Sequence, residues 1–275
     1  MTVEQRLREL FPTAKRTTLR RMVQTGRVRL RGAAVRRLAE VLDDPSQLEV
    51  LPRAPEPPRH RRGNLPIVYE DDDLLVLEKP PGLLTATTPR ETRPTLLAKV
   101  TAYLARTAPH ARVGLIHRLD RDARGLVVFS KNEAAYFALK AQLKARTLGR
   151  TYHAVVVGSP KLPEATLRSR LVEGPDGRVR STTDPRKGEE AVTHYRVVRP
   201  AAGGTLLEVR LETGRKHQIR VHLAEAGHPI VGDVLYAPPP HNCLPLRLAA
   251  TKLTLVHPRT GQTLLVQRPV PDDFG

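Results

Sequence analysis

AVTHYRVVRPAAGGTLLEVRLE, residues 191–212, is the stretch of sequence that decides the fold of this chain. Residues 191–199 and 204–212 are rich in Val, Leu, Thr and Tyr, and a short turn ending in Gly203 separates the two runs. β-branched and aromatic side chains favour strands, and so short a glycine-containing connection joins antiparallel neighbours. The stretch therefore predicts a β-hairpin.

Working outward, the sequence predicts more strands on both sides of this hairpin, with helices inserted between some of them. Strands are expected within 67–84, on either side of an acidic turn, and at 125–132, 151–158 and 246–258. Helices are expected at 96–108, 133–145 and 217–227. Because most connections have hairpin length, we predict an α+β domain with a mixed, largely antiparallel sheet and inserted helices, and not a doubly wound parallel sheet.

Residues 1–52 have the pattern of a small separate module. Val3, Leu7, Leu10 and Phe11 share one face of a helix, a second helix is expected at 17–26, and a strand pair should turn at Arg31-Gly32. Residues 1–63 contain 15 Lys and Arg against 7 Asp and Glu. The predicted helix and hairpin would present a basic surface, made of Lys15, Arg16, Arg20, Arg21, Arg27, Arg29 and Arg31.

The segment 53–66, RAPEPPRHRRGNLP, has no hydrophobic periodicity and is rich in Pro and Arg. Proline stiffens such a segment toward extended conformations, which is typical of a linker. We therefore expect three parts: a module at 1–52, a linker at 53–66 and a larger domain at 67–275.

The charge of the chain points to a polyanionic partner. Lys and Arg number 46 against 28 Asp and Glu, a net charge of +18. A GC-rich genome would explain Arg in place of Lys but not the uncompensated excess, so nucleic acid is the expected partner. Cys243 is the one cysteine, and no signal peptide or run of about 20 apolar residues is visible. We expect a cytoplasmic protein that does not enter a membrane.

Two polar segments are candidates for chemistry. In HRLDRDARGL, residues 117–126, Asp120 lies among several cationic side chains that would favour its charged form. Read alone, this segment is more typical of a solvated charged turn before a strand than of a reactive carboxylate. In ETGRKHQIRVH, residues 212–222, a glycine turn leads into a basic helix start, which is typical of an anion-binding site. His217 and Arg220 are three residues apart and should share a helix face.

At this point the sequence resembles the RluA-type pseudouridine synthases, which isomerise uridine in RNA. The resemblance rests on motifs that occur in the order of that family: LVLEKPPGLL (75–84), HRLDRDARGLVVFSKN (117–132), RTYHAVVVG (150–158), LETGRKHQIRVHLAEAGHPIVGD (211–233) and LRLAATKLTLVHPRTG (246–261). The N-terminal pattern, with LFP…KR and V-x-x-G-x-V before the Arg-Gly turn, resembles the S4 RNA-binding domain, a small α/β domain.

The resemblance implies a role for each matching residue. Asp120 would be the catalytic nucleophile, and Arg220 would pair with it and keep it ionised. Tyr152 would pack on the uracil, and Arg118 would fill the gap that the flipped base leaves. No cofactor and no metal would be needed. Further RNA contacts are expected from Arg215, Lys216, His217, Arg20, Arg21, Arg27 and Arg29.

The sequence departs from the family pattern at three places. Ala123-Arg124 stands where many members have Thr-Ser, Ala249 stands where a histidine is common, and Arg150 stands where many relatives have Lys. Because of these departures, the resemblance does not decide the details of the catalytic loop or which uridine is the target. Ribosomal RNA is the favoured substrate because of the S4-like module, with transfer RNA as the alternative, and we expect a monomer.

Three other interpretations were weighed. A metal site could be built from the Asp triplet 71–73 or from His217, His222, His228, His241 and Cys243. No metal-binding spacing is present, however, and solvated turn residues explain the triplet better. Glycoside hydrolysis by Asp120 and Asp122 does not fit the charge of the chain. A non-catalytic RNA-binding or ribosome-assembly protein would have the same fold, and only the altered Ala123-Arg124 pair supports it.

Overall fold

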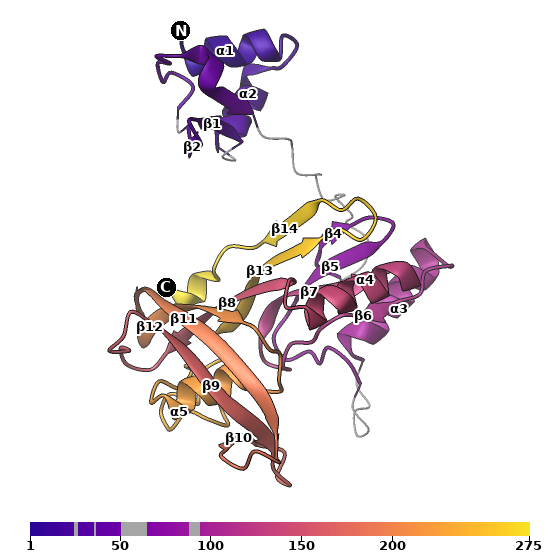
Figure 1. Cartoon of the computed structure of the whole chain (residues 1–275), viewed down its shortest axis with the longest axis vertical. Helices are drawn as coiled ribbons and strands as arrows, with labels where there is room; N and C mark the ends of the chain where they lie inside the picture. Colours follow the sequence, from indigo (N-terminus) through magenta and orange to yellow (C-terminus); the bar gives the residue numbers. More distant parts are fainter. Residues whose placement is uncertain (25–26, 36, 51–64, 88–93) are drawn as a thin grey trace. The chain divides into compact units, whose positions relative to one another are not determined.

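The computed structural model describes residues 1–24, 27–35, 37–50, 65–87 and 94–275 of the chain (Figure 1). Contacts divide the chain into two compact units, Met1–Arg59 and His60–Gly275. The division falls inside the segment that was expected to be a linker, most of which lies outside the described residues. Each unit is described by itself.

The first unit packs two helices against a small sheet. Helix α1 (Val3–Leu10) begins with a capping box of Thr2 and Gln5, and α2 (Arg16–Gln24) follows it. Strands β1 (Val28–Leu30), β2 (Ala33–Ala34) and β3 (Leu48–Val50) form an antiparallel sheet in the order β2-β1-β3, with the short 3₁₀ helix η1 (Pro45–Gln47) before β3. Arg31 and Gly32 both have positive φ, as a tight hairpin turn requires. Leu10, which was expected on the apolar face of α1, is instead exposed.

The second unit is built on one large sheet, with the strand order β10-β9-β11-β12-β8-β13-β7-β5-β4, plus β14 beside β13 and β6 beside β7. The strands are β4 (Ile67–Glu70), β5 (Leu74–Lys79), β6 (Gly114–Leu115), β7 (Arg124–Ser130), β8 (Gly149–Val156), β9 (Glu164–Glu173), β10 (Val179–Thr182), β11 (Glu189–Ala201), β12 (Gly204–Leu211), β13 (Leu248–Val256) and β14 (Thr263–Gln267). Among the described strands every pairing is antiparallel except that of β7 with β13. The predicted α+β class, with a largely antiparallel sheet, is confirmed.

The stretch 191–212 forms the predicted hairpin as β11 and β12. Helices α3 (Leu96–Thr107), α4 (Glu133–Lys144) and α5 (Gln218–Glu225) are inserted as expected, and the 3₁₀ helix η2 (Asp272–Phe274) ends the chain. Strands β6, β9, β10 and β14 were not predicted. No helix in the described part of the chain is long and apolar enough to cross a membrane.

The parallel contact between β7 and β13 depends on Gly125. Its φ is +113°, and a Cβ built on it would lie 2.1 Å from the carbonyl oxygen of Ala250. Only glycine permits so close an approach of two backbones. This contact joins the strand that follows Asp120 to the closing strand β13, which pairs on its other side with β8.

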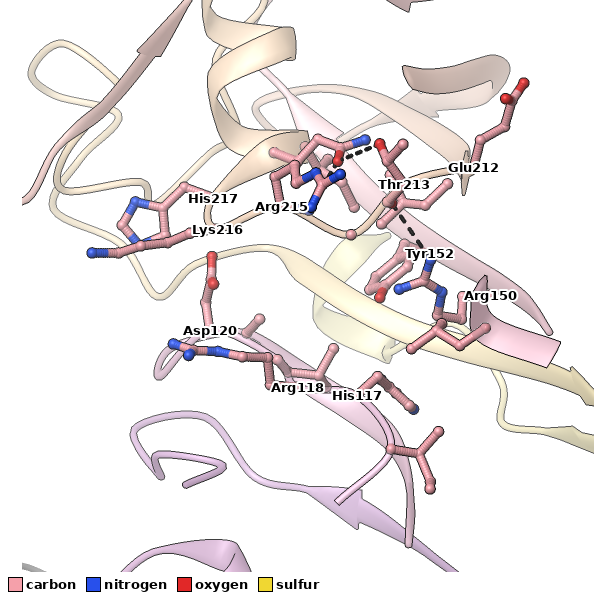
Figure 2. A pocket seen from close by; sticks show the side chains of 18 of the residues that line it. His117, Arg118, Asp120, Arg150, Tyr152, Glu212, Thr213, Arg215, Lys216 and His217 are labelled. Atoms are coloured by element: carbon pink, nitrogen blue, oxygen red, sulfur yellow. Dashed lines mark hydrogen bonds between the residues drawn. The ribbon is translucent and has the colours of Figure 1, made fainter. Parts of the chain in front are cut away.

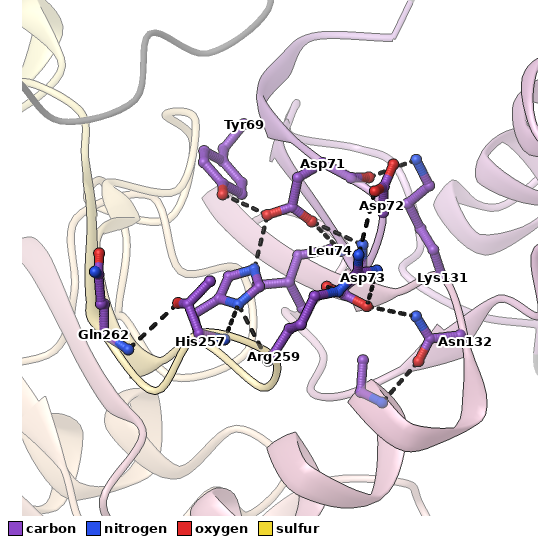
Figure 3. Close-up of polar contacts among 12 residues, drawn as sticks. Tyr69, Asp71, Asp72, Asp73, Leu74, Lys131, Asn132, His257, Arg259 and Gln262 are labelled. Atoms are coloured by element: carbon purple, nitrogen blue, oxygen red, sulfur yellow. Dashed lines mark hydrogen bonds and ion pairs between the residues drawn. The ribbon is translucent and has the colours of Figure 1, made fainter.

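The acidic turn between β4 and β5 is not a solvated turn, which corrects the expectation for Asp71 and Asp73. Asp71 accepts hydrogen bonds from the Tyr69 hydroxyl, from His257 Nε2 at 2.8 Å and from backbone amides (Figure 3). Asp73 is buried and paired with Arg259 at 2.7 Å. Among the described residues this is the one group whose His, Cys, Asp and Glu atoms lie close enough to hold a metal ion. The carboxylate oxygens of this group already accept hydrogen bonds from protein donors. We therefore interpret the group as a structural contact that joins the β4–β5 turn to the end of β13.

Candidate active site

Asp120 lies in the loop between β6 and β7, and this loop is held by hydrogen bonds on both sides of the carboxylate. The Thr85 hydroxyl donates to the carbonyl of Leu119 at 2.8 Å and accepts from its amide at 3.1 Å. The Lys79 ammonium donates to the carbonyl of Arg121 at 2.8 Å. The residues before and after Asp120 are therefore fixed, and the carboxylate is presented from a rigid segment.

Arg220, on α5, is the ion-pair partner of Asp120. Its Nη1 lies 3.2 Å from Asp120 Oδ2, although the two residues are 100 positions apart in the chain. Its Nε and Nη2 each donate to a carboxylate oxygen of Asp233 at 2.7 Å, and the guanidinium stacks on the ring of Tyr236. Burial opposes the charged form, but the hydrogen bonds and charge of Asp233, with those of Asp120, raise the pKa of Arg220 above its usual range. The cation is thus permanent and aimed by Asp233.

The start of α5 is fixed by a buried amide. Gln218 Oε1 accepts from the Thr213 hydroxyl at 2.8 Å and from the Arg215 amide at 3.0 Å, and Nε2 donates to the Val192 carbonyl at 2.9 Å. His217, just before the helix, adopts a left-handed conformation with φ of 54°. These contacts tie the predicted glycine turn to β11 and so position the helix that carries the ion-pair arginine.

Asp120, Arg220 and Tyr152 line one cavity of about 780 Å³, which also has apolar walls that include Leu119, Ile219 and Leu248 (Figure 2). Tyr152 is 5% exposed, on β8. Burial, and to a lesser extent the Asp120 charge, raise the pKa of its phenol, while the Arg150 charge lowers it. The protonated ring and the leucines form a surface on which a flat base can pack.

The cations at the cavity that were predicted to contact RNA differ in whether they already form an ion pair. Arg118 is exposed and makes no ion pair with the described part of the chain, so it is available to a ligand. Arg215 lies 2.7 Å from Glu189, and Lys216 is paired with Glu173. The last two must leave these carboxylates before they can bind phosphate, which sequence reasoning did not reveal.

His217 was expected to contribute to an anion site as a basic residue, and the structure does not support a charge there. It lines the cavity beside Arg220, with Nδ1 3.0 Å from the Tyr236 hydroxyl. Burial lowers the pKa of His217, despite the opposing charge of Asp120. The lowered pKa favours the neutral ring, which can contact a ligand through hydrogen bonding or packing.

The predicted RNA contacts of the first unit lie on α2 and near β1. Arg20 and Arg29 are exposed, and Arg29 Nη1 donates to the Gly32 carbonyl at 3.3 Å. Arg27 is partly buried, and the Arg21 side chain lies outside the described part of the chain.

Two residues of this site were not predicted to be functional: Asp233 and Lys79. Asp233 is fully buried and holds Arg220, while Lys79 is fully buried beneath the Asp120 loop. Asp233 belongs to a Gly-Asp pair and Lys79 to a Lys-Pro pair, and both pairs lie in the motifs that match the family. Neither pair by itself indicates a catalytic function. Lys79 ends β5 directly after the apolar run Leu74–Leu77 and Glu78, and a lysine that continues such a buried strand is the signal that could have revealed it.

The structure explains the altered Ala123-Arg124 pair. Ala123 is buried in the core, and Arg124 turns to the C-terminal segment, where it pairs with Asp273 and stacks over Phe274 with its Cζ 4.8 Å from the ring centre. Arg124 does not line the cavity. Ala249, the second departure, is buried beside the same Phe274. The Ala123-Arg124 pair and Ala249 therefore contribute to packing and do not add charge to the site.

Asp122 is exposed and does not line the cavity. The glycoside hydrolysis interpretation required a second carboxylate facing Asp120, and this one does not reach the site. Since Asp233 is occupied by Arg220, it cannot serve as a free general acid either. The geometry fits one reactive carboxylate held by one arginine.

Lys79 gives a testable pH dependence of stability. Burial lowers its pKa to about 8, against the raising effect of Asp122 and Asp120. Between this value and the unfolded value near 10.4 the unfolded chain binds more protons, so the free energy of unfolding should rise with pH, by up to about 1.4 kcal/mol per unit. Denaturant melts between pH 8 and 9.5 should show this slope in the wild type and lack it in Lys79→Met. Equal slopes in both proteins would refute the assignment.

The known proteins to which this chain is similar are RNA pseudouridine synthases. The sequence pattern of the RNA pseudouridylate synthase family matches residues 73–225. An uncharacterised RNA pseudouridine synthase of Synechocystis is 35% identical, over 98% of this chain and 85% of its own length. The ribosomal large subunit pseudouridine synthase D of Nitrosomonas europaea is 34% identical, over 100% of this chain and 82% of its own length.

A solved structure has the same fold. Human RNA pseudouridylate synthase domain containing 4 matches 76% of this chain and 89% of its own, with a TM-score of 0.63 and 23% identity. The family match and the similar sequences define an RNA-modifying isomerase. The chain belongs to the RNA pseudouridylate synthase family, in its RluA/RluD-type branch.

Proposed function

We propose that this enzyme converts uridine to pseudouridine in large-subunit ribosomal RNA, with Asp120 as its nucleophile. The choice of RNA is supported by the relatives named ribosomal large subunit pseudouridine synthase D, several of which align with almost the whole chain. The observation that carries the choice of residue is the 3.2 Å contact between Asp120 and Arg220, inside a cavity that also presents Tyr152.

The site can perform the isomerisation with its own side chains. The N1–C1′ bond of the target uridine breaks, the uracil rotates, and a C5–C1′ bond forms while C5 loses its proton. Asp120, paired with Arg220, attacks C1′ as the N1–C1′ bond breaks, and its bond to C1′ breaks again when C5 bonds to C1′. Tyr152 supports the ring while it turns. The scheme assigns no step to a metal or cofactor.

The target base must leave its stack to reach this cavity, which costs a few kcal/mol. Arg118 is suited to offset that cost because it is exposed at the cavity and its planar guanidinium can stack in the vacated place or bind phosphate. Lys216 and Arg215 would join it by exchanging their carboxylate partners for RNA phosphates.

The test is release of tritium from RNA labelled at C5 of uridine, since C5 loses its hydrogen in this reaction. We expect the wild-type enzyme to release tritium from large-subunit ribosomal RNA and not from transfer RNA. Release from transfer RNA alone would make that the substrate. Release from neither would favour a non-catalytic role in RNA binding. Comparing pseudouridines in RNA from cells with and without the gene would then locate the site.

We propose further that residues 1–52 form an S4-type RNA-binding domain, joined by a linker at 53–66 to a catalytic domain at 67–275. The two helices, the small sheet and the exposed Arg20 and Arg29 support this interpretation. We expect the enzyme to act as a monomer in the cytoplasm.

Deleting residues 1–52 should weaken RNA binding and flatten its salt dependence. Each phosphate contact that is lost lowers the slope of log K against log salt by about 0.7 on single strands. The measurement is filter binding of ribosomal RNA across a salt series, with the full chain as control. A weaker affinity with an unchanged slope would contradict the phosphate-binding role.

A further inference from the structure

Arg150 is a buried cation without a counter-charge among the residues that the structure describes. The residue is 8% exposed, its Nε is buried with no hydrogen-bond partner, and its one hydrogen bond, from Nη2 to the Thr213 carbonyl, is long at 3.5 Å. It makes no ion pair within the described part of the chain. Burying an unpaired charge is costly, and proteins usually neutralise such a group or pair it. An arginine cannot lose its proton, so a partner from outside the chain is expected.

The guanidinium faces the cavity that holds Asp120. Arg150 and Tyr152 are two residues apart on β8 and so point to the same side of the strand, and both line this cavity (Figure 2). Some other cations of the cavity wall are already paired, such as Arg146 with Glu212 at 2.8 Å, whereas Arg118 is exposed. The donors of Arg150 are therefore left for whatever enters.

The position of Arg150 indicates which part of a nucleotide it meets. Tyr152 lies between Asp120 and Arg150 in Figure 2, and both charges act on its phenol. A uracil packed on Tyr152 with its C1′ toward Asp120 has its opposite edge toward Arg150. Phosphates stay on the RNA backbone at the mouth of the cavity, where Arg118 is exposed. The buried arginine is thus placed for the base.

We propose that Arg150 donates a hydrogen bond to the C4 carbonyl oxygen of the flipped uracil and thereby selects uracil over cytosine. The C4 substituent of cytosine is an amino group, which is itself a donor and would face the guanidinium donors. This inference rests on the proposed function, because it takes the substrate to be a uridine flipped into this cavity.

The test compares Arg150→Met and Arg150→Lys with Arg106→Met, the same change at an exposed arginine of α3 outside the cavity. Two transcripts are used, identical except that the uridine modified by the wild type is cytidine in one. We expect the wild type to bind the uridine transcript at least about 10-fold more tightly and Arg150→Met to lose this preference. Tritium release by Arg150→Met should fall by about 10- to 100-fold in kcat/KM, with Arg150→Lys between the two. Arg106→Met should behave as the wild type.

The RNA-free proteins give an independent readout. Removing an unpaired buried charge should raise the melting temperature of Arg150→Met by about 2–4 °C, whereas loss of a structural contact would lower it. The inference is overturned if Arg150→Met keeps the wild-type preference for the uridine transcript, whatever its melting temperature. If the wild type releases no tritium from any RNA, the proposed function fails instead.

Discussion

Asp120→Asn should release tritium from C5-labelled RNA at least about 10⁴-fold more slowly than the wild type, because an amide cannot replace a carboxylate nucleophile. The substitution preserves size and keeps an oxygen that can accept the hydrogen bond from Arg220 Nη1. The loop itself is held through Thr85 and Lys79, which contact its backbone and not this side chain. The fold and the RNA affinity should therefore change little.

Asp122→Asn is the matched control for this prediction. It makes the same chemical change two residues away, at an exposed position that does not line the cavity. We expect its rate to stay within about threefold of the wild type, as is usual for surface changes. Comparable losses in both variants would mean that the loop needs its charge and would remove the nucleophile from Asp120.

Replacing Arg220 should lower activity far more than RNA binding. Arg220→Ala removes the partner of Asp120 and also leaves Asp233 buried, fully inaccessible and unpaired, which costs about 3–5 kcal/mol of stability. A milder variant is therefore needed. Arg220→Lys keeps the charge but not the planar fork that reaches both carboxylates. We expect about a 100-fold loss in kcat or more, with RNA affinity within about threefold.

Asp233→Asn provides the complementary measurement. It keeps an acceptor for Arg220 but removes the charge that aims and balances the guanidinium, so we expect reduced kcat with unchanged RNA affinity. Both variants are followed by single-turnover tritium release, filter binding and thermal melts. Parallel losses of binding and turnover would show that Arg220 contacts RNA directly, and the assignment to Asp120 would be wrong.

The sequence by itself determined the class of fold and the likeness to a family. Hairpin-length turns between alternating runs were enough to predict a largely antiparallel sheet, since local propensity and turn chemistry act over a few residues. The strands that were missed are short or charged, as β6 and β9 are, and their apolar pattern is weak. The motifs around Asp120, Tyr152 and Arg220 identified the candidate site because they were read together.

Only the tertiary structure shows which charged residues form ion pairs with one another. Among the cations near Asp120 in the sequence, Arg124 pairs with Asp273 of the C-terminal segment, and the ion-pair partner of Asp120 is Arg220, 100 positions away, which only the family resemblance indicated. The roles of Asp233 and Arg150 became visible only from burial: Asp233 holds Arg220, and the buried Arg150 has no ion-pair partner among the described residues. The physical reason is that charge interactions depend on distance and desolvation, and neither can be read from neighbours along the chain.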